Sequence, residues 1–325
     1  MSKALGLLSG GLDSSLAALT LKRQGVDVTC IAFVTPFFGA GRARQAAEQM
    51  DIPLIVSDIS DIHLEMIKNP RYGYGKNMNP CIDCHAMMFR LAGEIMAEQG
   101  FDFLFSGEVL GQRPMSQNPV ALKTVAKFSG HPDRILRPLS AKVLAITPME
   151  EEGLVDREHL LDIQGRSRKR QEALAKEWEL TDYPSSGGGC LLTEKSFSNR
   201  LRDLLEHNPQ ATPVDAELLK VGRQFRLADK VKLILGRKRS DNEAMKELIR
   251  PEDTTLRAKN FSGPLGLVTG DATPEQFETA AAMVATYGKG SDEENVEILL
   301  QRGDQRWEIS VAPADRDETR SLLIE

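Results

Sequence analysis

The chain has 325 residues, of which 41% are hydrophobic and 27% are charged. This length predicts two domains, and the composition excludes a disordered or fibrous protein. A net charge of −6 argues against non-specific coating of nucleic acid, although a local basic patch can still bind phosphates. No apolar run reaches the ~18–20 residues that span a bilayer, and the first residues lack the apolar core of a secretory signal. We expect a cytoplasmic protein without a membrane partner.

Strand and helix patterns alternate in the N-terminal part. Apolar runs predict strands at 4–8, 26–34, 54–56 and 101–105, and helical patterns extend through residue 23 and over 41–50 and 86–99. This alternation predicts an α/β fold, a mostly parallel sheet with helices on both faces. Ligands of such sheets bind at the carboxyl ends of the strands, so the loops at Ser9, Thr35 and Ser106 should share a binding edge. Polar loops are expected at 69–80 and 183–190.

The pattern changes after residue 208. Residues 197–206 predict a short helix, and 221–245 predict a strand, a turn, a strand and a helix. Further strands are expected at 264–270, 297–302 and 306–312, with a helix at 274–286. We therefore expect two domains, an α/β domain at 1–208 and a small α+β domain at 209–325.

Residues 9–15 form a candidate phosphate loop at the first strand–helix turn. Its two glycines let the backbone approach a phosphate, and the hydroxyls and the free N–H groups of the following helix can donate to phosphate oxygens. Asp13 can hold Mg²⁺ between phosphates. A Gly-Ser turn that only caps a helix is the alternative. The expected ATP-binding residues of the loop are Ser9, Gly10, Gly11, Leu12, Asp13, Ser14 and Ser15.

Three of the four cysteines are candidates for chemistry. Cys81 and Cys84 form a CxxC pair, and Cys190 follows three glycines. Three thiolates can hold three irons of a 4Fe–4S cluster and leave the fourth iron open. The alternatives are a zinc site completed by His85, a metal-free disulfide or persulfide pair with Cys190, and buried structural cysteines. Cys30 lies in an apolar strand and is expected in the core.

The SGGLDSS loop matches the signature of the PP-loop ATP pyrophosphatases. With the NPCIDC segment and the later lone cysteine, residues 5–107 resemble the tRNA thiouridine synthases. The resemblance implies a PP-loop/HUP-like, Rossmann-like fold, adenylation of the substrate and release of pyrophosphate. It also implies that Ala32, Phe33 and Gly107 line the adenine pocket, and that Cys190 is the second catalytic cysteine.

The chain departs from that family at several points. Ser106-Gly107-Glu108 stands where the family has Thr-Gly-His, and we see no β-barrel tail and no N-terminal RNA-binding module. The presence of Cys81, Cys84 and Cys190 together is more typical of the iron–sulfur-dependent tRNA thiolases. Which uridine is modified, and whether at the 2-thio or the 4-thio position, stays open.

Residues 218–248 resemble the NFACT-R type of RNA-binding domain. Alternation along a strand pair would put several basic side chains on one face, where they can bind phosphates. A solvated basic edge that blocks strand aggregation is the alternative. A second basic run at 166–170 can extend this path. The expected RNA-binding residues are Arg223, Arg226, Lys232, Arg237 and Lys238.

Together these features predict an ATP-dependent tRNA sulfurtransferase. ATP and Mg²⁺ would lie over residues 9–15, and a uridine carbonyl would be adenylated and replaced by sulfur from the cluster or from a persulfide on Cys190. The sulfur donor would be sulfide or a persulfide carrier. The alternatives are a metal-free persulfide thiolase, a PP-loop ligase of the amidotransferase type acting on a small molecule, an RNA-binding protein with a relic loop, and a desulfidase.

Overall fold

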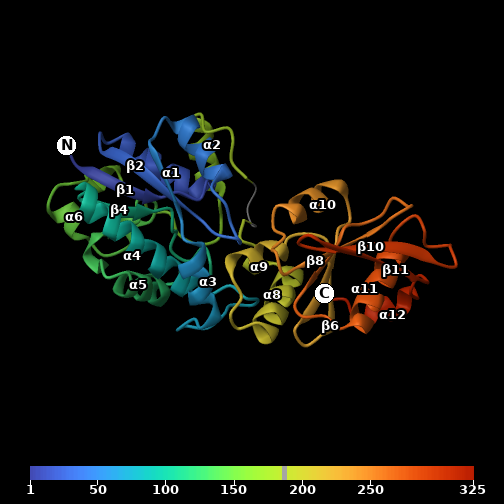
Figure 1. Cartoon of the computed structure of the whole chain (residues 1–325). Coiled ribbons are helices and arrows are strands. Elements are labelled where there is room, and N and C mark those ends of the chain that lie inside the picture. Colours follow the sequence, from blue (N-terminus) through green and yellow to red (C-terminus); the bar gives the residue numbers. More distant parts are fainter. Residues whose placement is uncertain (185–188) are drawn as a thin grey trace. The chain divides into compact units, whose positions relative to one another are not determined.

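The computed structural model describes residues 1–184 and 189–325. It divides into two compact units, Met1–Cys190 and Leu191–Glu325 (Figure 1). The division therefore precedes α8 (Lys195–His207), whereas the sequence pattern suggested a boundary after this helix. The reason is that α8 is bonded to the second unit: Asp203 accepts from Nη2 of Arg226 at 2.6 Å, and Arg200 donates to the Leu219 carbonyl at 3.0 Å.

The N-terminal unit is built on a five-stranded parallel sheet of order β3-β2-β1-β4-β5. The four strands expected here are confirmed, with bounds shifted by one to two residues. The fifth strand was missed because two residues give no pattern. The strands are β1 (Lys3–Leu7), β2 (Asp27–Val34), β3 (Leu54–Asp58), β4 (Phe103–Ser106) and β5 (Ile135–Leu136).

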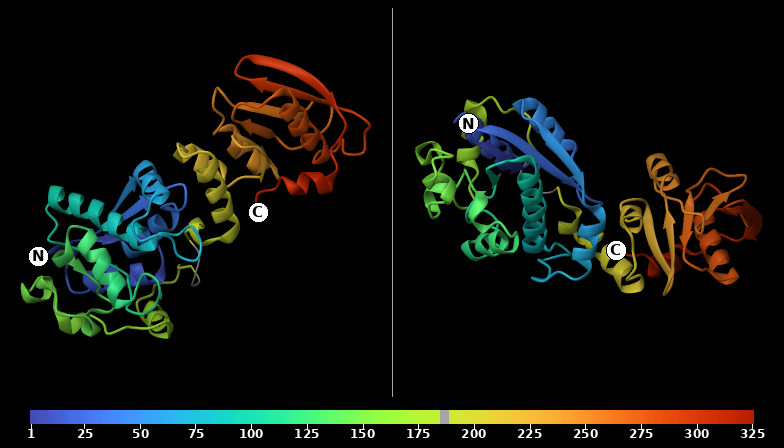
Figure 2. Two further views of the ribbon diagram at one scale, coloured as in Figure 1. Left: turned by 90° about the horizontal axis from the view of Figure 1, so that it is seen from below. Right: turned by 60° about the vertical axis from the view of Figure 1, so that its left-hand side comes forward.

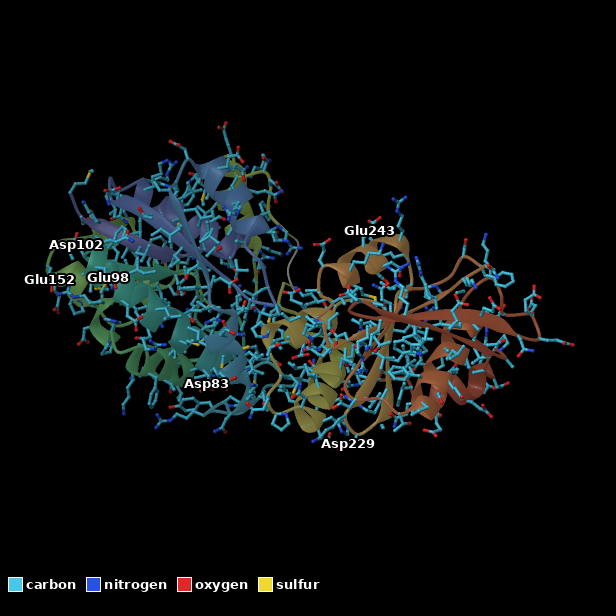
Figure 3. The ribbon with its side chains drawn as sticks, in the orientation of Figure 1. Asp83, Glu98, Asp102, Glu152, Asp229 and Glu243 are labelled. Carbon is cyan, nitrogen blue, oxygen red and sulfur yellow. The ribbon has the colours of Figure 1, made fainter. Side chains whose placement is uncertain are left out.

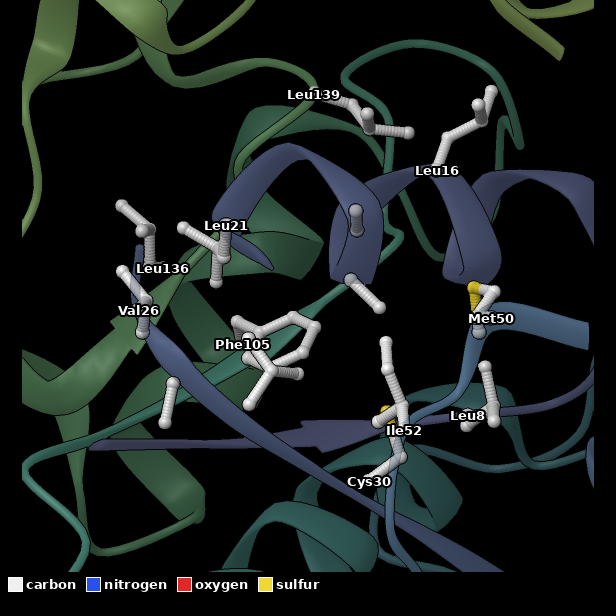
Figure 4. Packing of buried hydrophobic residues seen from close by; sticks show 14 of the residues in the cluster. Leu8, Leu16, Leu21, Val26, Cys30, Met50, Ile52, Phe105, Leu136 and Leu139 are labelled. Carbon is white, nitrogen blue, oxygen red and sulfur yellow. The ribbon is translucent and has the colours of Figure 1, made fainter. Parts of the chain in front are cut away.

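Helices cover both faces of this sheet, as the alternation predicted. Along β4, Phe103 and Phe105 pack into one apolar cluster with α1, whereas Leu104 packs into a second cluster with α4. Figure 4 shows part of the first cluster, with Cys30 inside it. The helices are α1 (Leu12–Lys22), α2 (Gly41–Met50), α3 (Ser60–Lys68), α4 (Cys81–Gln99), α5 (Pro119–Phe128), α6 (Pro148–Glu151) and α7 (Lys169–Glu177).

Two helices differ from expectation. Helix α4 begins at Cys81, five residues earlier than the apolar periodicity indicated, so both cysteines of the CxxC pair lie in its first turn. Helix α3 was missed because Ile62, Leu64 and Met66 alternate with polar residues, a pattern typical of a strand. No described helix is long and apolar enough to cross a bilayer.

The C-terminal unit contains a six-stranded sheet of order β11-β10-β8-β9-β7-β6 with antiparallel pairing throughout. Helix α11 (Pro274–Thr286) packs on one face, as seen from two further sides in Figure 2. The expected α+β character is thus confirmed. The remaining elements are α9 (Pro213–Leu218), β6 (Arg223–Ala228), β7 (Val231–Leu235), α10 (Arg239–Lys246), β8 (Thr254–Ala258), β9 (Gly266–Thr269), β10 (Val296–Arg302), β11 (Gln305–Val311) and α12 (Arg316–Ser321).

Candidate phosphate and thiol site

The phosphate loop lies at the carboxyl edge of the parallel sheet, where glycines permit close backbone approaches. Gly10 has φ +73°, and a Cβ there would lie 2.3 Å from the carbonyl carbon of Arg42 in α2. A Cβ on Gly107, which follows β4, would lie 2.4 Å from the amide nitrogen of Ser14. These two positions therefore require glycine, and they bring the ends of β1 and β4 and the start of α2 around the loop.

The loop hydroxyls are partly used for local hydrogen bonds. Ser14 Oγ and Ser15 Oγ both donate to the Gly11 carbonyl, at 2.9 and 3.1 Å. Ser9 Oγ accepts from the Gly11 N–H at 3.3 Å, and Ser9 is exposed to solvent. Leu12 is buried in the core. Ser9 and the amides at the start of α1 are therefore the loop groups best placed to meet a phosphate.

Asp13 is held by a chain of amides that the sequence did not reveal. Its Oδ2 accepts from Gln112 Nε2 at 2.7 Å, and Gln112 Oε1 accepts from Gln171 Nε2 at 2.9 Å. Asp13 Oδ1 is buried and has no hydrogen-bond partner among the described residues. A buried carboxylate oxygen without a partner beside a phosphate loop fits a Mg²⁺ ligand.

The residues expected beside adenine lie where their side chains serve packing. Ala32 and Phe33 in β2 are buried on opposite faces of the sheet. Only the main chain of this strand end is left to contact a nucleotide. A hollow does adjoin the loop; it is lined by Gly10, Arg42, Gln45, Asp182, Tyr183 and Pro184.

The three candidate cysteines lie in the same unit, and Cys84 is the most deeply buried of their thiols. Burial raises the pKa of the Cys84 thiol well above its usual value, and the negative charges of Cys190 and Cys81 raise it further. Asn79 Nδ2 donates to Cys81 Sγ at 3.3 Å. Among residues 1–184 and 189–325, no group of three or more His, Cys, Asp or Glu is arranged to hold a single metal ion. Two glycines of the expected run before Cys190, at 187 and 188, lie outside the described residues.

A histidine that the sequence did not single out contacts this group. His63 Nε2 lies 3.3 Å from Cys84 Sγ, and the ring is fully buried beside Phe37 and Phe38. Burial lowers the pKa of His63 to about 4, so the imidazole is neutral at pH 7. Its position in the middle of an unpredicted helix gave no signal in the sequence.

His85, the candidate fourth zinc ligand, is bound elsewhere. Its Nδ1 lies 2.9 Å from Oε1 of buried Glu108, whose Oε2 accepts from Arg137 Nε at 2.9 Å. Burial alone would raise the pKa of Glu108, but Arg137 and His85 outweigh it and lower that pKa to about 2. The ionised carboxylate therefore fixes His85, which accounts for glutamate in the Ser106-Gly107-Glu108 turn.

Cys30 is confirmed as a core residue. It is 1% exposed, and burial raises its pKa to about 12 (Figure 4). It therefore stays a thiol and has no part in the site.

The basic residues of the C-terminal unit do not form one open face. Arg237 and Lys238 are exposed, but Arg226 is paired with Asp203, and Arg223 stacks on Tyr287 at 4.8 Å. The expectation of an exposed strand face was wrong for Lys232, which is 5% exposed. Helices cover both sides of β7, because its alternate residues join two separate apolar clusters.

Comparison with known proteins supports the resemblance for both units. Residues 1–143 match the family model "Thiamine biosynthesis protein (ThiI)", and residues 222–322 match the "NFACT protein RNA binding domain". The N-terminal unit is therefore similar to PP-loop proteins in its fold and its phosphate loop, and the C-terminal unit is similar to the NFACT domain.

Several tRNA-thiolating enzymes are also similar to this chain in sequence. The tRNA-specific 2-thiouridylase MnmA of Desulfosudis oleivorans is 38% identical over 25% of this chain and 24% of its own length. MnmA of Cutibacterium acnes is 26% identical over 59% of this chain and 55% of its own. A probable tRNA sulfurtransferase of Oceanobacillus iheyensis is 28% identical over 42% and 34%. The chain thus spans about half or less of the length of these relatives.

Proposed function

We propose that this chain is an ATP-dependent tRNA sulfurtransferase that replaces a uridine carbonyl oxygen with sulfur. The observation that carries the proposal is that the CxxC pair, Cys81 and Cys84, lies in the first turn of α4, in the same unit that holds the phosphate loop and Cys190. A ligase that transfers nitrogen would need no such group of thiols. The two kinds of relative, 2-thiouridylases and probable tRNA sulfurtransferases, support the same chemistry.

The first half-reaction uses the phosphate loop. The uridine oxygen attacks the α-phosphorus of ATP, and pyrophosphate leaves, since a carbonyl oxygen is a poor leaving group and AMP is a good one. Ser9, the amides at the start of α1 and the α1 dipole stabilise the phosphate charge. Asp13, oriented by Gln112, would hold Mg²⁺, which supplies positive charge to the departing pyrophosphate.

The second half-reaction uses the thiols. Sulfur attacks the activated carbon, and AMP leaves with the former carbonyl oxygen. Cys81, Cys84 and Cys190 would hold a 4Fe–4S cluster, which when bound supplies one iron without a protein thiolate, open to sulfide. The donor set fits in kind: Cys81 and Cys84 share the first turn of α4, thiolates are the usual ligands of such clusters, and a bound cation favours the thiolate over the thiol.

A metal-free persulfide route is the second candidate, because a CxxC pair in the first turn of a helix also suits thiol–disulfide exchange. The terminal sulfur of a persulfide on Cys190 would attack the activated carbon. A second thiolate would then cleave the S–S bond and leave a disulfide for an external thiol to reduce.

The test combines a thiolation assay with metal analysis on protein purified without oxygen. With ATP, Mg²⁺, sulfide and tRNA, the wild type should form AMP, pyrophosphate and thiouridine in equal amounts, measured by mass spectrometry of the digested nucleosides. Asp13→Asn should abolish all three. Failure of the wild type to form AMP with any tRNA would refute the proposed function.

Iron and sulfide content separates the two routes. About four irons and four sulfides per chain are expected for a 4Fe–4S cluster. Cys190→Ala should lose this iron and sulfide, whereas the matched control Cys30→Ala should retain them. Thiolation by protein without iron, with a persulfide carrier as the donor in place of sulfide, would instead support the persulfide route.

A further inference from the structure

Two exposed tyrosines stand in the loop between α3 and α4. Tyr72 is 41% exposed and Tyr74 is 39% exposed, and they are two of only four tyrosines in the chain. Most large apolar side chains of this unit are buried, so a pair of rings on one short loop is unusual for a surface that contacts only water. Tyrosine rings of this kind are typical of contact surfaces for another molecule.

The Tyr72 ring belongs to a layer of cations and aromatics, whereas the Tyr74 hydroxyl donates to the Ile67 carbonyl at 2.6 Å. The Arg71 guanidinium lies 4.2 Å from the ring centre of Phe128 and 5.9 Å from that of Tyr72, and the two rings meet edge to face at 5.4 Å. The Lys127 ammonium lies 5.7 Å from the Phe128 ring centre. Arg71, Lys127 and Lys76 are exposed residues. Positive charge beside aromatic rings, in a chain of net charge −6, suits an anionic partner that carries aromatic rings of its own.

This layer is fixed to the turn that carries the thiols. Asp83, between Cys81 and Cys84 and labelled in Figure 3, accepts from the backbone N–H groups of Arg71 and Tyr72, both at 3.0 Å. Asn79 donates through its side chain to Cys81 Sγ, and its backbone carbonyl accepts from the Gly75 N–H at 3.0 Å. The loop is therefore tied to the CxxC turn by hydrogen bonds at both of its ends, through Asp83 at one end and Asn79 at the other.

We propose that Arg71, Tyr72 and Phe128 form a stacking platform for unpaired bases of the substrate RNA that flank the target uridine. The assignment rests on the proposed function for the identity of the substrate. A base whose carbonyl is to be adenylated must leave its helical stack, and its neighbours then lose stacking partners. Aromatic rings and a guanidinium plane replace that stacking without reading sequence, and Lys76 and Lys127 would neutralise adjacent phosphates.

The experiment measures binding of fluorescent tRNA by anisotropy, without ATP or sulfide, for the full-length protein. Tyr72→Ala is expected to weaken binding by on the order of 5- to 100-fold, the range for loss of one base–aromatic stack. Tyr72→Phe keeps the ring and should restore wild-type affinity, whereas Tyr72→Leu, apolar but not aromatic, should not. Ile146→Ala is the matched control, because Ile146 is 59% exposed in the same unit and lies in no part of the platform. Thermal unfolding of each variant excludes loss of fold as the cause.

The outcomes separate the platform from a docking site for a protein sulfur donor, and the failure of the platform from the failure of the proposed function. Equal tRNA affinity of Tyr72→Ala and Ile146→Ala would overturn the platform even if the wild type thiolates tRNA. Unchanged tRNA affinity with an increased KM for a protein sulfur donor would also overturn it, and would assign the patch to that donor. If Tyr72→Ala binds tRNA weakly while the wild type never forms AMP, the platform stands and the sulfurtransferase function fails.

Discussion

Replacing Lys232 by methionine should stabilise the C-terminal unit, and more so at low pH than at high pH. Lys232 lies in β7 and is 5% exposed. Burial lowers the pKa of its ammonium from 10.5 to about 7; the charge of Asp203 opposes this shift, and that of Arg226 adds to it. Asp203 is itself bound by Arg226, and Asp215, the other nearby carboxylate, is bound by Arg250. The ammonium is therefore buried beside acids whose charges are already compensated.

The magnitude follows from proton linkage. One pKa unit corresponds to about 1.4 kcal/mol, so the buried charge costs roughly 4–5 kcal/mol below pH 7. Because the folded pKa lies below the unfolded pKa, the unfolded chain binds more protons between about pH 7 and pH 10.5, and the stability of the unit rises with pH across this window. Methionine has a similar length and no charge. Its advantage over lysine should therefore be several kcal/mol at pH 6.5 and smaller by roughly 2 kcal/mol at pH 9.0.

The assay is urea unfolding followed by the fluorescence of Trp307, in a background with Trp178→Phe. The chain has only these two tryptophans, one in each unit, so the signal then reports on the C-terminal unit alone. Lys230→Met, at an exposed position in the turn between β6 and β7, is the matched control and should change stability little at either pH. The same stability difference between Lys232→Met and wild type at pH 6.5 and at pH 9.0 would refute the reasoning.

Three further predictions concern the N-terminal unit. Gly107→Ala should reduce ATP affinity at least tenfold in isothermal titration, because its Cβ would press on the first turn of α1; unchanged affinity would contradict the close approach. Glu108→Gln should lower the free energy of unfolding by about 3–5 kcal/mol in calorimetry, since Arg137 would stay buried without a counter-charge, and a loss below 1 kcal/mol would count against it. Gln112→Leu should raise the Mg²⁺ concentration needed for half-maximal AMP formation, because Asp13 loses its orienting donor; an unaltered Mg²⁺ requirement would show that the amide has no such role.

Much of the fold could be predicted because it is encoded in neighbouring residues. The alternation of apolar runs with helical periodicity gave four of the five parallel strands, and the helix at Pro274–Thr286 begins and ends where its pattern does. The phosphate loop was found because its glycines, serines and aspartate are contiguous, and the CxxC pair because its cysteines share one helical turn. Where a local pattern was ambiguous, as in the alternating Ile62, Leu64 and Met66 of α3, the helix was not expected.

The partners of the site residues, by contrast, were decided only by tertiary structure. His63 and Cys84 are 21 residues apart, His85 and Glu108 are 23 apart, and Glu108 and Arg137 are 29 apart. Such pairs meet because separate elements cross the same sheet edge, and no periodicity within either element records the meeting. Lys232 has the pattern of a basic strand residue in the sequence, yet helices on both sides of its sheet bury it. The sequence by itself thus determined the chemistry available at the site, and packing at long range determined which groups face one another and in which charge state.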